Sequence, residues 1–149
     1  MRLGGYPGAL REVLGVRVEE FFPLLEGQVV QLSGGGTGTV WTELLGAGRA
    51  EVLQTVVDGP LPGTPAVTRA THGHGTAWYL ATSPDPVTLR SVLQSAAEAA
   101  GVRPAADVPE GVEAVRRGDR LFVINHTAED VTVLGTLVPA GDATVLAAE

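Results

Sequence analysis

Two histidines separated by one glycine are the first candidates for chemistry in this 149-residue chain. His72 and His74 could offer two imidazoles to a metal ion. A zinc site takes three or four protein ligands, and the chain has no cysteine and no third ligand nearby in the sequence. We therefore interpret this segment as the polar tip of a glycine-rich hairpin and predict no metal-ligating residue.

Paired carboxylates would indicate acid–base catalysis. Glu19 and Glu20 are adjacent on a predicted strand, so their side chains should point to opposite faces. Asp107, Glu110 and Glu113 flank a proline-containing linker and are expected to be solvated. No serine lies in a Gly-x-Ser-x-Gly context. The sequence therefore predicts neither catalytic nor cofactor-binding residues.

Three short motifs have ordinary structural interpretations. The glycine-rich loop 34–38 could cradle a phosphate, but it lacks the strand-to-helix context of a dinucleotide fingerprint, so we interpret it as a flexible loop. Segment 117–119 reads as an adhesion tripeptide, yet Gly-Asp between two strands is typical of a hairpin turn. Segment 125–127 is a formal glycosylation sequon. The N-terminus lacks the apolar stretch of a secretion signal, which argues against both extracellular roles.

The elements that would position these residues change character once along the chain. Helices alternate with strands in the first two thirds. The clearest helix begins with Asp85 as N-cap and Pro86 as first helical residue, and ends at Gly101. Its predicted apolar face consists of Leu89, Val92, Leu93, Ala96 and Ala100. The earlier predicted elements are a helix from Pro7 to Gly15, strands at 16–19, 28–32, 40–44 and 51–56, and a hairpin of 65–70 with 76–81.

The pattern after residue 104 is β only. Prolines in the segment 103–109 resist both helix and central strand, so this segment is predicted to be a linker. The strands predicted beyond it are 112–116, 120–125, 131–134 and 144–147. Their regular spacing with turn signals favours a small antiparallel sheet, which is marginal on its own and should dock on the first part.

Composition excludes several function classes. The ten basic residues are all arginine, and with 17 acidic residues they give a net charge of −7. An acidic, lysine-free chain argues against nucleic-acid and membrane-surface partners. It also excludes a Walker P-loop and a Schiff-base lysine. No stretch approaches the roughly 20 apolar residues of a membrane span, so we expect a cytoplasmic protein.

A family resemblance adds what spacing cannot supply. Segments 3–21, 41–43, 65–82, 111–117 and 121–127 resemble bacterial β-galactosidases of glycoside hydrolase family 42, in the expected order. The resemblance implies a complete enzyme with a catalytic (β/α)₈ barrel, then a flavodoxin-like or glutamine-amidotransferase-like domain that helps assemble trimers, then a small β-sandwich. The catalytic carboxylates and the metal site lie on the barrel. No position of this chain matches their motifs.

The resemblance therefore implies a fragment. Residues 1–103 would be the C-terminal half of the trimerisation-like domain, a partial α/β three-layer fold, and residues 104–149 a small C-terminal antiparallel β domain. The expected function is a non-catalytic assembly and C-terminal region of a β-galactosidase whose complete form hydrolyses terminal β-D-galactosides with retention. The chain alone would be inactive. Its expected partners are further copies of itself or the missing barrel region.

Truncation has a physical consequence. A doubly wound sheet that lacks its opening strands has an uncovered edge and an uncovered face. We therefore expect the isolated chain to oligomerise or to be only marginally stable. The alternative is a free-standing carbohydrate-binding or protein-interaction module without hydrolase activity. Sugar platforms use exposed aromatic rings, and the available Trp and Tyr residues are Tyr6, Trp41, Trp78 and Tyr79.

Overall fold

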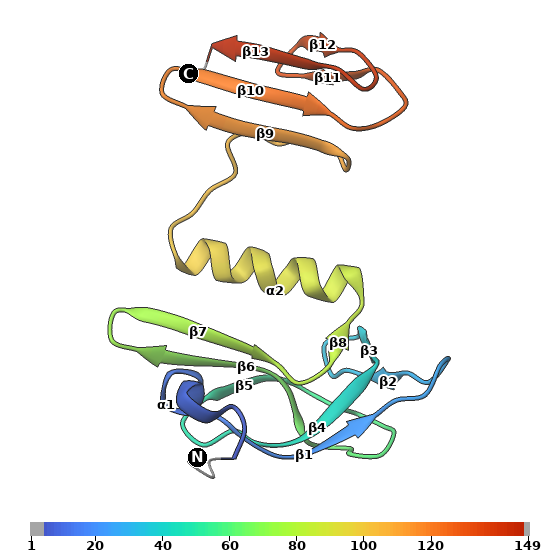
Figure 1. Ribbon diagram of the computed structural model, residues 1–149, viewed down its shortest axis with the longest axis vertical. Coiled ribbons are helices and arrows are strands. Elements are labelled where there is room, and N and C mark those ends of the chain that lie inside the picture. Colours follow the sequence, from blue (N-terminus) through green and yellow to red (C-terminus); the bar gives the residue numbers. More distant parts are fainter. Residues whose placement is uncertain (1–4, 148–149) are drawn as a thin grey trace. The chain divides into compact units, whose positions relative to one another are not determined.

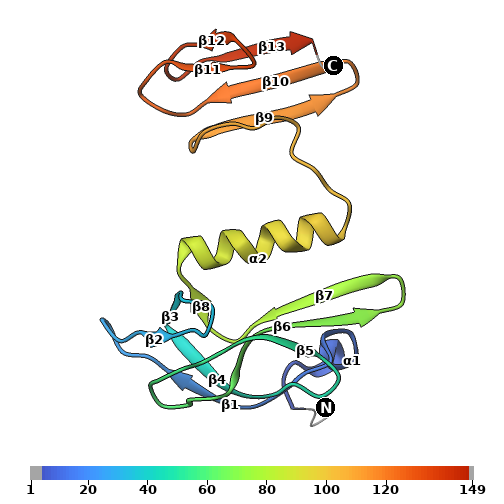
Figure 2. The ribbon, with the colours of Figure 1, turned by 180° about the vertical axis from the view of Figure 1, so that it is seen from behind.

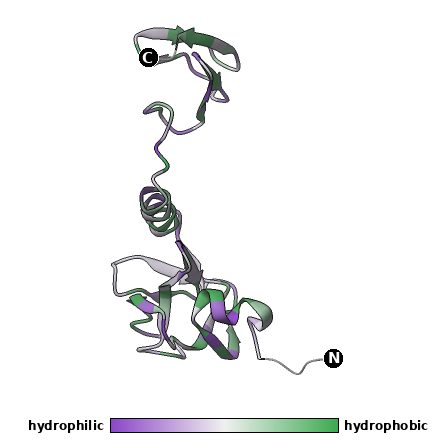
Figure 3. Cartoon of the chain, turned by 90° about the vertical axis from the view of Figure 1, so that its left-hand side faces the viewer, coloured by the Kyte–Doolittle hydropathy of each residue, from purple (hydrophilic) through white to green (hydrophobic). Residues whose placement is uncertain are grey.

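The computed structural model describes residues 5–147 (Figures 1 and 2). The chain divides into two compact units, the first reaching Gly101 and the second beginning at Val102. Hydrophobic segments are concentrated along the strands of each unit (Figure 3). Within residues 5–147, no helix combines the length and the apolar character needed to cross a membrane.

The first unit is a set of small antiparallel sheets. Its sheets have the strand orders β1-β4, β2-β3-β8 and β5-β6-β7. In chain order its elements are the 3₁₀ turn η1 (Gly8–Leu10), α1 (Arg11–Leu14), β1 (Arg17–Pro23), β2 (Val30–Gln31), β3 (Thr37–Thr39), β4 (Trp41–Gly46), β5 (Glu51–Thr55), β6 (Pro65–His72), β7 (Gly75–Leu80), β8 (Ser83–Pro84) and α2 (Pro86–Ala99).

The core of the first unit lies between these sheets. One buried cluster contains Val16, Val18, Leu45, Ala50, Ala70 and Ala81, and a second contains Val30, Leu32, Val56 and Ala66. Gly15 positions the first cluster because it ends α1 in the left-handed conformation, with φ +66°. A Cβ at Gly15 would lie 2.9 Å from Cγ of Arg49, so a side chain there meets both backbone strain and a clash.

Helix α2 begins as the sequence predicts. Oδ1 of Asp85 accepts hydrogen bonds from the backbone N–H of Val87 and Thr88, both at 3.0 Å, and Pro86 is the first helical residue. The predicted apolar face is only partly buried. Val92 is buried, whereas Leu93 is 60% exposed and Leu89 is also exposed. The helix buries one narrow stripe within its own unit and presents the rest of its apolar face to solvent.

The second unit is all β. It contains β9 (Val112–Arg117), β10 (Arg120–Asn125), β11 (Val131–Val133), β12 (Thr136–Val138) and β13 (Ala143–Ala147). The sheet order is β13-β10-β9, beside the hairpin β11-β12. The buried residues are Val112, Leu121, Val123, Val133 and Val138, and Ala105, Ala106 and Val108 of the predicted linker pack against them. The linker therefore forms part of this core.

The first unit departs from the fold that the resemblance implies. The antiparallel β unit predicted after residue 104 is confirmed, whereas the described part of the first unit consists mostly of strands, with α1 and α2 as its α-helices instead of an alternation of helices and strands. The three-layer α/β arrangement of the flavodoxin-like prediction is not shown, because every strand pair described in residues 5–147 is antiparallel. Parallel pairing needs a crossover of a dozen or more residues, and the connections between paired neighbours such as β6 and β7 are short turns.

Candidate functional site

A buried carboxyl group is the most unusual polar feature of the first unit. Glu43 lies on β4 and is 2% exposed. Its Oε1 accepts a hydrogen bond from Nε1 of Trp41 at 3.1 Å, and its Oε2 accepts one from the Tyr79 hydroxyl at 2.7 Å. Trp41 lies two residues away on the same strand, while Tyr79 lies on β7. The carboxyl group therefore ties β4 to a distant hairpin.

The surroundings of Glu43 disfavour its charge. Burial raises the pKa of Glu43, and the hydrogen bonds from Tyr79 and Trp41 only partly oppose this effect. Burial together with the Glu43 carboxyl also raises the pKa of Tyr79, which therefore stays a hydrogen-bond donor. No arginine or histidine among residues 5–147 forms an ion pair with Glu43. The protonated form is thus favoured relative to an exposed glutamate.

Aromatic residues surround this carboxyl group. Phe21 on β1 is the register partner of Glu43, and its ring meets the ring of Tyr6 edge to face at 5.1 Å between centroids. Trp78 is placed elsewhere, with the guanidinium of Arg69 over its ring at 5.6 Å. The polar atoms of Trp41 and Tyr79 are directed to Glu43. These contacts do not favour the flat sugar platform considered from the sequence.

A second carboxylate has the opposite electrostatic character. Oδ2 of Asp85 accepts hydrogen bonds from the Thr37 backbone N–H at 2.7 Å and the Thr88 hydroxyl at 2.8 Å. The hydrogen bonds from Thr37 and Thr88 lower the pKa of Asp85 to about 2. A Cβ on Gly36 would lie 1.9 Å from the Thr88 hydroxyl oxygen. The glycine loop is thus packed against α2, and a carboxylate already takes the position that a phosphate would need.

The histidine segment forms the predicted hairpin. His72 ends β6 and pairs with Gly75 of β7, so Gly73 and His74 form a two-residue turn. The Arg49 guanidinium lies 3.4 Å from Nδ1 of His72 and donates to the Thr71 carbonyl at 2.6 Å. Within residues 5–147, no group of three or more His, Asp or Glu side chains converges as a metal site requires. The absence of metal ligands stays a prediction.

Among the described residues, the other carboxylates considered from the sequence do not form a pair that could act in catalysis. A register shift between Val18 and Glu20 leaves both Glu19 and Glu20 exposed on β1. Gly118 and Asp119 connect β9 to β10, where Arg117 pairs with Arg120, which confirms the hairpin interpretation of the adhesion-like tripeptide. The structure brings none of these carboxylates together with Glu43.

Asn125 is the polar centre of the second unit, which the sequence did not reveal. It is 1% exposed. Its side-chain nitrogen lies 2.8 Å from the Glu129 carbonyl, 3.0 Å from that of Pro139 and 3.1 Å from that of Val138. Its side-chain oxygen accepts from the Thr127 N–H and hydroxyl at 3.0 and 2.7 Å. The amide that a glycan would modify is thus buried and holds the loop between β10 and β11.

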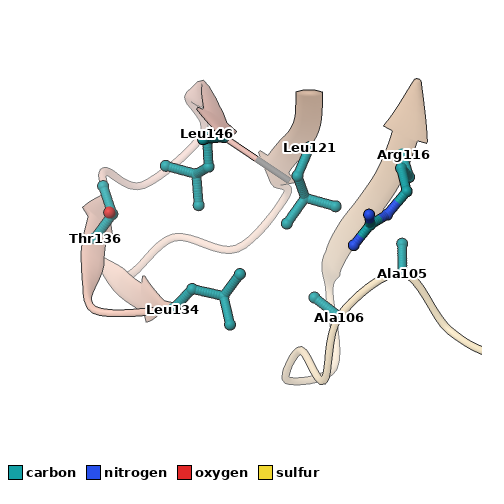
Figure 4. Close-up of a pocket in the computed structure, with 8 residues that line it drawn as sticks. Ala105, Ala106, Arg116, Leu121, Leu134, Thr136 and Leu146 are labelled. Carbon is teal, nitrogen blue, oxygen red and sulfur yellow. The ribbon is translucent and has the colours of Figure 1, made fainter. Parts of the chain in front are cut away.

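A cavity of about 560 Å³ lies within the second unit (Figure 4). It is lined mainly by aliphatic side chains, with Arg116 at one side. Leu134 lines the cavity from the turn between β11 and β12. Its φ of +48° is a strained conformation for a residue with a side chain. The lining residues are Ala105, Ala106, Arg116, Leu121, Leu134, Thr136, Leu146 and Ala147. Among the described residues, its lining offers two polar side chains, Arg116 and Thr136.

The fold and these sites define a β-rich module with buried polar anchors. The sequence model of the β-galactosidase trimerisation domain matches residues 1–103. The chain belongs to this family, within glycoside hydrolase family 42. The family resemblance stated from the sequence is therefore confirmed.

Relatives support this membership over the whole chain. A β-galactosidase from Arthrobacter sp. is 47% identical, covering 95% of this chain and 22% of the relative. A second β-galactosidase, from Heyndrickxia coagulans, is 46% identical over a match that covers 84% of this chain and 20% of the relative. The crystal structure of β-galactosidase from Bacillus circulans sp. alkalophilus matches with a TM-score of 0.86 and 30% identity. The match covers 99% of this chain and 26% of that structure's chain. The chain thus spans about a fifth to a quarter of the length of these relatives.

Proposed function

We propose that this chain is a non-catalytic assembly and C-terminal region of a β-galactosidase. The observation that carries the proposal is the match of the trimerisation-domain family to residues 1–103. The complete enzyme would hydrolyse terminal β-D-galactosides in carbohydrate metabolism, with two carboxylates outside this chain. Glu43 does not serve this chemistry, because it is buried and both oxygens accept hydrogen bonds from the protein.

Self-association follows from the family. A trimerisation domain brings copies of its own chain together, so the proposed partners are further copies and the barrel region of the complete enzyme. The two compact units support a division into a trimerisation-domain part at 1–103 and a small C-terminal β domain at 104–149. The cytoplasmic location remains a prediction from the sequence.

The exposed face of α2 supports a larger α/β domain. Leu89 and Leu93, four positions apart on one side of the helix, are exposed, whereas the neighbouring Val92 is buried within its own unit. An apolar stripe on a helix normally packs against another layer. In the complete enzyme, this stripe would pack against the remaining layers of the flavodoxin-like arrangement, for which the present chain supplies only a part.

Two measurements on the 149-residue chain test the proposal. Light scattering coupled to size-exclusion chromatography should show an assembly larger than a monomer. A chromogenic galactoside assay should show no turnover, with the complete Arthrobacter β-galactosidase as positive control. A chain that is monomeric at every concentration contradicts the assembly role, and robust turnover contradicts the non-catalytic role. Retention on a galactose column would instead favour the free-standing carbohydrate-binding module.

A further inference from the structure

We infer that copies of this chain associate head to tail, through two different surfaces at opposite ends of the β1–β4 ribbon. The inference rests on the self-association proposed above and names the residues that carry it. The register pairs Arg17 with Gly46 at one end of the ribbon and Pro23 with Trp41 at the other. At about 3.3 Å per residue, the ends are roughly 20 Å apart.

The first surface, the turn patch, consists of Leu25, Glu26 and Val40. The turn is fixed by the Gln28 side chain, which accepts from the Leu25 N–H at 2.8 Å. The Leu24 N–H donates to the Val40 carbonyl at 2.8 Å and so places Val40 beside the turn. Leu25 is 71% exposed and Val40 is 60% exposed. The patch therefore presents two aliphatic side chains next to one carboxylate.

Val40, which belongs to the turn patch, has a strained backbone conformation. Its φ of +67° is an outlier for a β-branched residue, because the side chain meets its own backbone there. Glycine or asparagine adopts this conformation at lower cost. Val40 gains little burial within its own unit in return for the strain. A contact with another molecule would give the valine side chain a packing role at this position.

The second surface, the arginine-rimmed pocket, lies at the other end of the ribbon. It is a shallow depression of about 420 Å³ that is lined by the glycines Gly15, Gly46 and Gly48 and lies over the buried Val16. Arg11, Arg17 and Arg49 line it together with Glu12. Glu19 forms an ion pair with Arg17 at 4.0 Å, so the three guanidinium groups and the carboxylates of Glu12 and Glu19 give this rim a net charge of +1.

The two surfaces are complementary in charge. Glu26 carries a negative charge beside the exposed Leu25, and the depression into which the Leu25 side chain would dock has a rim of net positive charge. Because the surfaces differ, each copy uses one to bind a second copy and leaves the other free for a third. Such a heterologous contact builds a ring when the rotation between copies closes. A trimer is a ring of this kind with three identical contacts.

Charge reversal of exposed side chains tests the contact. Glu26→Arg should repel the rim, and the double variant Arg11→Glu, Arg17→Glu should repel the turn patch. Each should raise the dissociation constant of the assembly at least about tenfold in light scattering or native mass spectrometry. The matched controls are Glu98→Arg and Arg90→Glu, which reverse exposed charges on α2. Far-UV circular dichroism and thermal melting check that all variants remain folded.

Mixing the two charge-reversed variants gives the decisive result. Head-to-tail contact predicts that the Glu26→Arg and Arg11→Glu, Arg17→Glu chains form a mixed pair in native mass spectrometry, although neither associates with itself. The mixed pair is the readout, because a closed ring of three cannot alternate two kinds of chain and would keep one repelling contact. A wild-type chain that assembles while both variants assemble equally well overturns this contact and leaves the proposed function standing. Weakened variants that form no mixed pair also overturn it. A monomeric wild-type chain instead contradicts the proposed function itself.

Discussion

Each of the two units contains a deeply buried side chain that accepts or donates several hydrogen bonds, Glu43 in the first and Asn125 in the second, and the two differ in chemistry. In the first unit Glu43 is held by the side chains of Trp41 and Tyr79. In the second unit Asn125 is held mostly by backbone groups between Thr127 and Pro139. The partners of Asn125 lie within 14 positions in sequence, whereas Tyr79 is 36 positions from Glu43.

The difference has consequences for stability. A buried amide does not titrate, so Asn125 should stabilise its unit independently of pH. A buried carboxyl group makes stability depend on pH, because the folded and unfolded states bind its proton with different affinity. We therefore expect the contribution of Glu43 to the stability of the first unit to change with pH. The contribution of Asn125 to the stability of the second unit should not change with pH.

The largest expected effect comes from converting the Asn125 amide into a carboxylate. Asn125→Asp removes the donors to three carbonyl groups and buries an unpaired charge, which should destabilise the second unit by about 3–5 kcal/mol at neutral pH. Amide hydrogen exchange should show lost protection in β10 while β6 keeps its protection. Thr132→Asp, at an exposed position on β11, is the matched control. Unchanged exchange in β10 would contradict the anchoring role of Asn125.

The next effect comes from removing one donor to Glu43. Tyr79→Phe leaves Oε2 of Glu43 without its partner and should destabilise the first unit by about 1–3 kcal/mol. Tryptophan fluorescence during urea unfolding reports this unit alone, because both tryptophans, Trp41 and Trp78, lie in it. In a double-mutant cycle with Glu43→Gln the two changes should be strongly non-additive. Additive effects would mean that the two side chains do not act together.

Glu43→Gln should change the pH dependence of the first unit. Since the folded pKa is raised above the ordinary glutamate pKa of 4.5, Glu43 contributes a stability that is complete below that pH and is lost as pH rises through the folded pKa. The Glu43→Gln variant should not show this loss of stability as pH rises. Asp85 has the opposite sign, because its folded pKa of about 2 means that stability is lost as pH falls below about 4.

Asp85→Asn is therefore the control for the pH experiment. It should remove the acid-side loss and retain the fall caused by Glu43. Urea midpoints followed by tryptophan fluorescence from about pH 2 to about pH 8 separate the two contributions. If Glu43→Gln shows the same pH profile as the wild type above pH 4.5, Glu43 does not titrate differently in the folded state.

The smallest effects concern the strained residues that each unit contains. Val40 and Leu134 have positive φ angles, which asparagine tolerates better. Val40→Asn and Leu134→Asn should each stabilise their own unit by up to about 1 kcal/mol in thermal melting. Only Val40→Asn should also weaken self-association in light scattering, because Val40 belongs to the turn patch. Equal weakening by both variants would argue against a specific role of that patch.

Local signals predicted much of the secondary structure. Asp85 and Pro86 begin α2, Gly15 ends α1, and the hairpin around Gly73 is present as expected. Local signals failed where pairing is short or long-range. The glycine loop contributes β3, which pairs with β2 and β8. The strand predicted at 131–134 is confirmed as β11, but its hairpin partner β12 was not predicted. A pattern of alternating side chains does not reveal such brief strands.

The set of buried residues also differs from the one that the sequence predicts, because burial depends on contacts between distant segments. The spacing of Leu89, Val92 and Leu93 correctly places them on one helix face, but only Val92 is buried. Thr42 and Glu43 point to opposite faces of β4, and both are buried. A strand covered on both sides gives no polar–apolar alternation from which the buried carboxyl could have been recognised.

The sequence by itself determined the positions of turns and helix ends, the chemistries excluded by the lack of lysine and cysteine, and the family. These features depend on residue type and on neighbours within a few positions. Only the tertiary structure decided that Glu43 and Asn125 are buried, that Asp85 binds the glycine loop, and that the turn patch and the arginine-rimmed pocket lie at opposite ends of one ribbon. Burial, pKa and surface placement arise from contacts between distant segments, such as Glu43 with Tyr79, which no local pattern records.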